Sequence, residues 1–174
     1  MGRHLFSGVG SGFASRHKGA GLKPQARVDH KAGQGPVKRG ADDFLGAWRI
    51  TREIVDHKLG QTGSLEGDAT FTVTAGGLRY HERGTLRYGG GAPLVAERGY
   101  LWTFTPDAVE VAYDDGAPFH KFVPEGRVDA TPHLCGEDLY HGSYDLTGFP
   151  VWSVTWSVRG PRKDYRSVTW YRRA

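Results

Sequence analysis

From Phe44 onward, apolar and polar residues alternate with a period of two, the pattern of half-buried β-strands. Gly, Pro and Asp residues that form turns interrupt this alternation about every 8 to 12 residues. No window of about 11 residues or more has a helical period, so we expect at most one short helix. The predicted strands cover residues 44–58, 64–74, 78–88, 94–104, 108–113, 118–123, 126–134, 137–146, 151–159 and 165–173.

Strands joined by loops this short favour an up-and-down meander. Closure of a long meander removes its exposed sheet edges. We therefore predict an all-β fold, a single antiparallel up-and-down β-barrel of about eight to ten strands over residues 42–174. If the barrel binds a small molecule, it should enclose a cavity of roughly a few hundred Å³, whereas a lumen packed solid would favour a module that binds a protein or RNA.

Residues 1–41 form a segment of different composition, rich in Gly, Lys, Arg, Ser and Ala and without apolar periodicity. We expect a disordered basic tail. The tail holds eight Lys or Arg and one Asp, whereas the rest holds fifteen basic and eighteen acidic residues. The basic character thus belongs to the tail, and the barrel is not expected to bind nucleic acid; only the tail is a candidate for that.

The same composition bears on location. No apolar run approaches the roughly 20 residues of a membrane helix, so no membrane partner is expected. The tail lacks the apolar stretch of a secretory signal, and Cys135 alone cannot form an intrachain disulfide. We expect a cytoplasmic protein, or an organellar one if residues 1–41 are a transit peptide; an upstream extension from a mis-assigned start is equally open.

The first and last strands of the predicted barrel resemble those of the calycin superfamily, which includes lipocalins, fatty-acid-binding proteins and nitrobindins. Gly46 and Trp48 form a Gly-x-Trp at the start of the first strand, and Arg172 and Arg173 end the last. The resemblance implies that Trp48 closes the barrel floor and that Arg172, or else Arg173, packs across its ring by a cation–π contact. An ordinary core tryptophan is the simpler alternative.

A more specific resemblance, over about residues 44–173, is to domain of unknown function 6314, a family of small domains. It implies a calycin-like barrel and no established activity. The segments that carry it are Phe44-Leu-Gly-x-Trp48, Leu78-x-Tyr-x-Glu-x-Gly84, Ala96-x-Arg-x-Tyr-x-Trp102, Asp115-Gly-x-Pro-Phe-His120, His133-x-Cys135 with Asp138-x-Tyr140, and Gly160-Pro-x-Lys-Asp-Tyr165.

Strand 94–104 places Arg98 on the same face as Tyr100 and Trp102, which is the apolar face and so points inward. A buried guanidinium needs a carboxylate or an anionic ligand. Glu82, which shares a face with Tyr80 on the neighbouring strand, is a candidate partner. Arg98 is therefore either half of a structural ion pair or an anion clamp.

His120 shares a face with Phe122, and His133 shares one with Cys135. Both histidines are candidates for acid–base catalysis, for metal or haem ligation, or for a hydrogen-bonded core position. Two residues are too few for a closed zinc site, so no metal site is assigned, and haem remains an alternative. Cys135 could form a nucleophilic pair with His133, although a buried inert thiol is the simpler interpretation.

Two further groups complete the expected site. The loop before the last strand brings Lys163, Asp164 and Tyr165 to one barrel end, where they could form a rim or lid, or a solvated turn. Tyr140 and Trp156 lie on aromatic faces that become a ligand wall if the lumen is not filled.

We therefore predict a small-molecule-binding barrel of unknown ligand, anionic or amphipathic. The first alternative is an isomerase, cyclase or hydrolase that uses His120 or His133. The second is a module that binds a protein or RNA.

Overall fold

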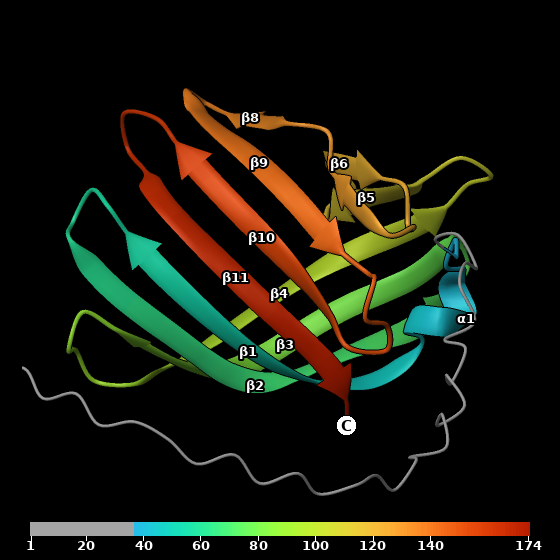
Figure 1. Cartoon of the computed structure of the whole chain (residues 1–174), viewed down its shortest axis with the longest axis horizontal. Helices are drawn as coiled ribbons and strands as arrows, with labels where there is room; N and C mark the ends of the chain where they lie inside the picture. Colours follow the sequence, from blue (N-terminus) through green and yellow to red (C-terminus); the bar gives the residue numbers. More distant parts are fainter. Residues whose placement is uncertain (1–36) are drawn as a thin grey trace, which may run out of the picture. The chain divides into compact units, whose positions relative to one another are not determined.

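The structure is a computed structural model that describes residues 37–174 (Figure 1). It contains one short helix and eleven strands. They are α1 (Ala41–Phe44), β1 (Gly46–Asp56), β2 (Gln61–Thr74), β3 (Gly77–Tyr88), β4 (Leu94–Phe104), β5 (Val109–Tyr113), β6 (Pro118–Phe122), β7 (Arg127–Asp129), β8 (His133–Cys135), β9 (Asp138–Asp145), β10 (Trp152–Arg159) and β11 (Asp164–Arg173).

The strands form one antiparallel sheet in the order β6-β5-β4-β3-β2-β1-β11-β10-β9-β7, with β8 also paired to β9. The pairing of β1 with β11 joins the first strand to the last, and most other neighbours are consecutive in sequence. The sheet curls into a nearly closed barrel with a seam between β6 and the segment that follows β7 (Figure 1). The prediction of an all-β up-and-down barrel is confirmed.

One predicted strand, 126–134, is two short strands, β7 and β8, that follow one another along the same edge of β9. The ladder breaks because Thr131 turns away from β9 and bonds to β6 across the seam. Its backbone N–H donates to the Lys121 carbonyl at 2.8 Å, and its Oγ1 accepts from the Lys121 N–H at 2.9 Å. Pro132 then has no N–H to offer a ladder. The barrel still has ten strand positions around its circumference.

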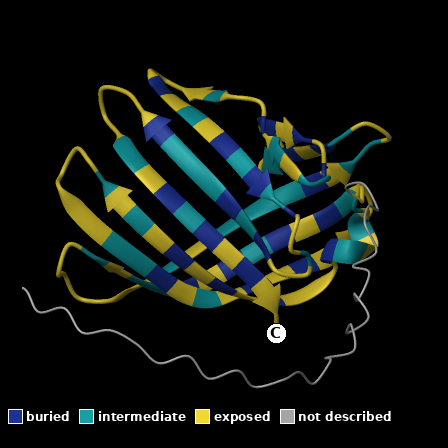
Figure 2. Ribbon diagram, in the orientation of Figure 1, coloured by how far each residue is buried: buried dark blue, intermediate teal, exposed yellow. Residues whose placement is uncertain are grey.

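Buried and exposed positions alternate along the strands, so one face of the sheet forms the core (Figure 2). Aromatic rings fill one barrel end. Phe44 of α1 and Trp48 are both fully buried there, and the Trp48 Nε1–H donates to the Phe44 carbonyl at 2.7 Å. The predicted strand at Phe44 is thus a helix that caps the barrel floor.

Arg173, not Arg172, covers the floor. Its guanidinium carbon lies 4.0 Å from the centre of the Trp48 ring, and its Nη1 donates to the Leu45 carbonyl at 2.6 Å. Register explains the correction, because Trp48 pairs with Arg173, whereas Arg172 pairs with Arg49 and is exposed. The resemblance implied the correct interaction but did not decide between two adjacent arginines.

Of the expected disordered tail, residues 1–36 lie outside the described residues, as does any nucleic-acid contact through them. The last part of the expected tail contacts the barrel. The Arg39 N–H donates to the Pro124 carbonyl at 2.7 Å, and its guanidinium carbon lies 4.6 Å from the Phe149 ring centre. Between residues 37 and 174, no helix is long and apolar enough to cross a membrane.

Candidate ligand-binding site

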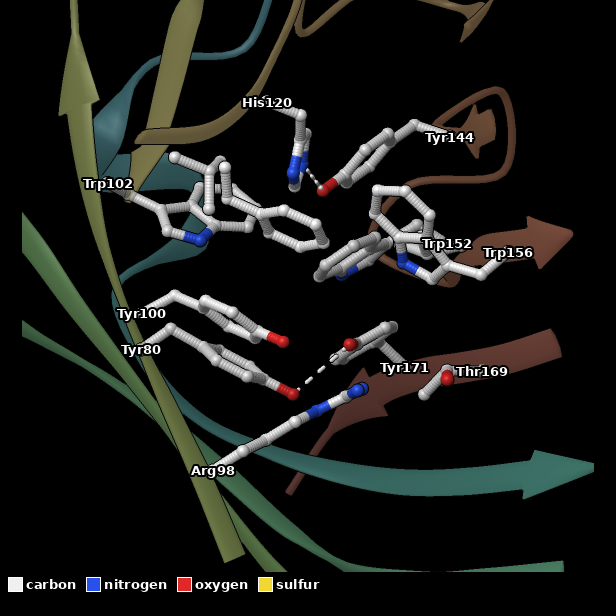
Figure 3. Close-up of a pocket in the computed structure, with 13 residues that line it drawn as sticks. Tyr80, Arg98, Tyr100, Trp102, His120, Tyr144, Trp152, Trp156, Thr169 and Tyr171 are labelled. Carbon is white, nitrogen blue, oxygen red and sulfur yellow. Dashed lines mark hydrogen bonds between the residues drawn. The ribbon is translucent and has the colours of Figure 1, made fainter. Parts of the chain in front are cut away.

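The inner face of the barrel surrounds a cavity of about 30 Å³ above the floor (Figure 3). Its walls are mainly aromatic and come from β3, β4, β5, β6, β9, β10 and β11. The lining residues are Tyr80, Arg98, Tyr100, Trp102, Val111, Phe119, His120, Tyr144, Trp152, Val154, Trp156, Thr169 and Tyr171.

This free volume is far smaller than the expected few hundred Å³, and it holds about one or two water molecules. The expectation was wrong because the aromatic side chains fill the lumen, so a ligand larger than a water molecule can enter only if one of them moves. Phe119 contributes most unexpectedly, since strict alternation with Phe122 would have turned it outward. A β-bulge in the β5–β6 pairing shifts the register between Val111 and Ala112, so both Phe119 and His120 are buried.

Phe119 lies between two parallel rings. Its centre is 5.5 Å from that of Tyr100 at an angle of 17°, and 5.0 Å from that of Trp156 at 18°. Both neighbours have further support. Tyr100 stacks on Tyr80 at 6.1 Å, and the Trp156 ring covers Gly142, where an added Cβ would come within 2.7 Å of it.

A charged cluster lies beside this aromatic stack. Arg52 donates two hydrogen bonds of 2.8 Å to the two carboxylate oxygens of Glu82, and its Nε donates to Thr169 Oγ1 at 2.6 Å. The Arg98 Nε lies 2.8 Å from Glu82 Oε1, and the Tyr80 hydroxyl also donates to this carboxylate. One carboxylate therefore holds two guanidinium groups, which leaves the cluster with one excess positive charge.

The electrostatics keep Glu82 and Arg98 ionised. Burial alone would raise the pKa of Glu82, but Arg98 and Arg52 outweigh it and lower that pKa to about 2. Burial alone would lower the pKa of Arg98, but Glu82 raises it above its usual value. Arg52 and Glu82 are 7 % and 2 % exposed, whereas the Arg98 side chain is 38 % exposed. Arg98 is the member that a ligand can reach.

His120 is buried, and its Nε2 pairs with the Tyr144 hydroxyl at 2.7 Å (Figure 3). Its Nδ1 has no hydrogen-bond partner in the part of the chain that the structure describes. Burial, and then the nearby His133, lower the pKa of His120 to about 3. The imidazole is neutral near pH 7.

The other expected residues of this region lie outside the cavity wall. His133 packs its ring against Phe119 at 4.9 Å and faces the Tyr113 hydroxyl at 3.4 Å. Tyr140 lies 6.4 Å from Phe119, farther from the cavity. Cys135 is exposed, so the interpretation as a buried thiol was wrong; it belongs to a three-residue strand at the barrel end.

The loop before β11 and the first residues of that strand bond to other segments of the same barrel end. The Lys163 ammonium donates to the Tyr140 hydroxyl, and the Asp164 carbonyl accepts from the His57 and Lys58 N–H groups at 2.8 and 3.2 Å. Tyr165 is half-buried, and burial raises its pKa to about 12. These three residues lie at the barrel end and do not line the cavity.

This loop is anchored by a residue of the same family motifs. Asp138 is fully buried and accepts from the Arg162 N–H at 3.1 Å. An added Cβ at Gly160 would come within 2.3 Å of the Asp138 carboxylate. The motif segments 138–140 and 160–165 therefore hold the β8–β9 turn against the β10–β11 loop.

The described residues do not contain a group of three or more His, Cys, Asp or Glu side chains that could hold a metal ion. His120 and His133 do not point into a space that fits haem, because the cavity of about 30 Å³ is far smaller than a porphyrin. Neither group fits the site in this conformation.

Sequence reasoning brought several cavity residues together correctly, namely Tyr80, Arg98, Tyr100, Trp102, His120 and Trp156. It missed Arg52, although Trp48, Ile50 and Arg52 alternate along β1 and so share the inward face. It also missed Phe119, for which the bulge left no signal in the alternation.

Comparison with solved structures finds similar barrels. An S-type phycobiliprotein lyase from Guillardia theta aligns with 77 % of this chain and 90 % of its own, with a TM-score of 0.56 and 9 % identity. A protein of unknown function from the DUF3598 family of Nostoc punctiforme PCC 73102 aligns at a TM-score of 0.48 and 13 % identity, over 77 % of this chain and 48 % of that one. The redesigned barrel mFAP1, bound to DFHBI, aligns at 0.39 and 15 %, over 77 % and 99 %.

At such low identity, the likeness to the lyase shows the fold alone. A search among curated proteins finds no match to this sequence. The family model of DUF6314, a family of unknown function, matches residues 44–173. The chain therefore belongs to the DUF6314 family.

Proposed function

We propose that the barrel binds a small organic anion with an apolar body, and that Arg98 contacts its negative group. The observation that carries the proposal is the charge of the cluster. Glu82 neutralises one guanidinium, and Arg52 already holds both carboxylate oxygens. The second guanidinium, at the end of the partly exposed Arg98 side chain, is left with a net positive charge at the edge of an aromatic cavity.

An aromatic wall with one polar anchor suits such a ligand. Apolar surface buried against the rings stabilises the complex by roughly 25 cal/mol per Å². A charge-assisted hydrogen bond to Arg98 would fix its orientation.

Binding is better supported than acid–base catalysis. A histidine suited to proton transfer has a pKa near the working pH. Burial, with His133, holds the pKa of His120 at about 3, and its Nε2 is engaged with Tyr144. These features favour a fixed, neutral wall residue at His120.

The test is titration calorimetry of the full chain with two anions, octanoate and naphthalene-2-carboxylate, and with the neutral naphthalene-2-carboxamide. We expect at least one anion to bind, and Arg98→Gln to weaken it at least about tenfold. Arg83→Gln is the matched control, because Arg83 pairs with Glu97 at 2.9 Å on the same two strands but on the outer face. Equal binding by both variants, stronger binding of the amide, or no anion binding would refute the proposal.

A further inference from the structure

We propose that the Phe119 ring fills, in the free protein, a slot that receives a flat conjugated ring of the ligand. This inference rests on the proposed function and names the ligand class as an aromatic or conjugated organic anion. Phe119 is then the residue that determines whether a ligand enters and which ligand shape the slot accepts.

The slot has two walls that do not depend on Phe119. Tyr100 is held by its stacking on Tyr80, and Trp156 by its contact with the backbone at Gly142. Both walls are nearly parallel to the ring between them, at 17° and 18°. Removal of that ring would leave a gap one ring thick, a geometry that favours a flat guest over a flexible chain.

The slot adjoins the charged cluster. The Arg98 guanidinium carbon lies 5.7 Å from the centre of the Tyr100 ring. Arg98 and Phe119 both line the inner cavity, so a ligand ring in the slot that extends beyond Tyr100 would bring its carboxylate toward Arg98. The same ligand could use both features at once.

Phe119 belongs to a weakly held part of the barrel. Strand β6 has five residues, its pairing with β5 is interrupted by the bulge, and its other edge faces the seam. Across that seam, Lys121 and Thr131 exchange two hydrogen bonds, of which one joins two backbone groups. A short, bulged edge segment with few ladder bonds opens at lower free-energy cost than the central strands.

Space for the displaced ring exists on the outer side. A groove of about 410 Å³ lies along β5 and β6, and Phe119, His120 and Val111 line both this groove and the inner cavity. The inner cavity, at about 30 Å³, has no room for a second ring. The ring of Phe119 would leave toward the groove while the ligand enters the lumen.

Displacement of Phe119 must reduce the apparent affinity, because only the open fraction of the protein binds. Phe119→Ala removes this penalty. We expect it to bind naphthalene-2-carboxylate at least about tenfold more tightly than the wild type. Octanoate, which has the same charge but no ring, should gain much less.

Phe122→Ala is the matched control. Phe122 lies on the same strand and is buried, but it stacks on Tyr144 at 3.7 Å and does not line the cavity. An equal gain in Phe122→Ala, an equal gain for octanoate, or no gain in Phe119→Ala would overturn the slot. If octanoate binding by the wild type still depends on Arg98, the proposed function survives that result; if no anion binds at all, both fall.

A measurement on the wild type covers the case in which Phe119→Ala fails to fold. In the free protein, nuclear Overhauser effects should join the rings of Phe119 and Trp156. Saturation with naphthalene-2-carboxylate should replace them with effects between the ligand and Trp156. Retention of the Phe119–Trp156 effects at saturation, or no saturable binding, would overturn the inference.

Discussion

Glu82→Gln tests the charged cluster that organises the lumen. Glu82 is 2 % exposed and bridges Arg52 and Arg98, so its neutral replacement leaves Arg52 buried without a counter-charge. Loss of one partner from a buried ion pair costs about 3–5 kcal/mol. We expect a loss of that size in the free energy of unfolding at pH 7.

The same residue sets a pH dependence. Its pKa falls from the ordinary value of 4.5 to about 2 in the folded state, so the unfolded state takes up the proton first. The resulting stability is complete above about pH 4.5 and is lost as the pH falls toward 2. Each tenfold difference in proton affinity between the two states corresponds to about 1.4 kcal/mol, so the loss amounts to roughly 3.5 kcal/mol.

The assay is urea unfolding followed by tryptophan fluorescence at a series of pH values. The difference between wild type and Glu82→Gln isolates Glu82, because other titrating groups are common to both proteins. Glu97→Gln is the control, since Glu97 pairs with Arg83 on the exposed outer face and should cost at most about 1 kcal/mol. If Glu82→Gln costs no more than Glu97→Gln, or if the two pH profiles are parallel below pH 4.5, the ionised cluster is refuted.

Three further predictions concern the floor, the buried histidine and the loop. Arg173→Ala should lower the free energy of unfolding by about 1–2 kcal/mol, because the protein loses a cation–π contact and hydrogen bonds to backbone carbonyls. In the same urea assay, Arg172→Ala should change the free energy of unfolding by less than about 0.5 kcal/mol. The ring protons of His120 should keep their neutral chemical shifts from about pH 8 to pH 5, because burial lowers its pKa from 6.5 to about 3; a midpoint near 6.5 would contradict its burial. Gly160→Ala should lower the free energy of unfolding by more than about 2 kcal/mol, because its Cβ would come within 2.3 Å of a buried carboxylate. Gly76 has open space around it, so Gly76→Ala should unfold within about 0.5 kcal/mol of the wild type. Equal losses in the two variants would argue against this packing.

Much of the fold follows from local pattern. The period of two places Trp102, Phe122 and Trp152 on the inward face, and the structure buries all three. Regular alternation indicates which side chains face inward, because one face of each strand contacts the core. The break between β7 and β8 depends instead on a hydrogen bond from Thr131 to Lys121 across the seam, which the local pattern of residues 126–134 does not encode.

The candidate site was only partly accessible to the same reasoning. Arg98 and Glu82 were recoverable as a pair because their strands are neighbours, and the register places them directly opposite each other. Phe119 was not, because a bulge reverses the facing of one residue without changing the sequence alternation. The volume of the lumen depends on how rings from seven strands pack together, and alternation gives the facing of each ring but not its packing.

The location of a bound anion tests the central claim most directly. In a nuclear magnetic resonance titration with naphthalene-2-carboxylate, we expect the Nε–H signal of Arg98 and the Nε1–H signal of Trp156 to shift together and saturate at one ligand equivalent. The Nε1–H signal of Trp170, a residue that is 38 % exposed on the outer face, should stay in place. A saturable shift at Trp170 with none at Arg98 would place the ligand outside the barrel and contradict the account.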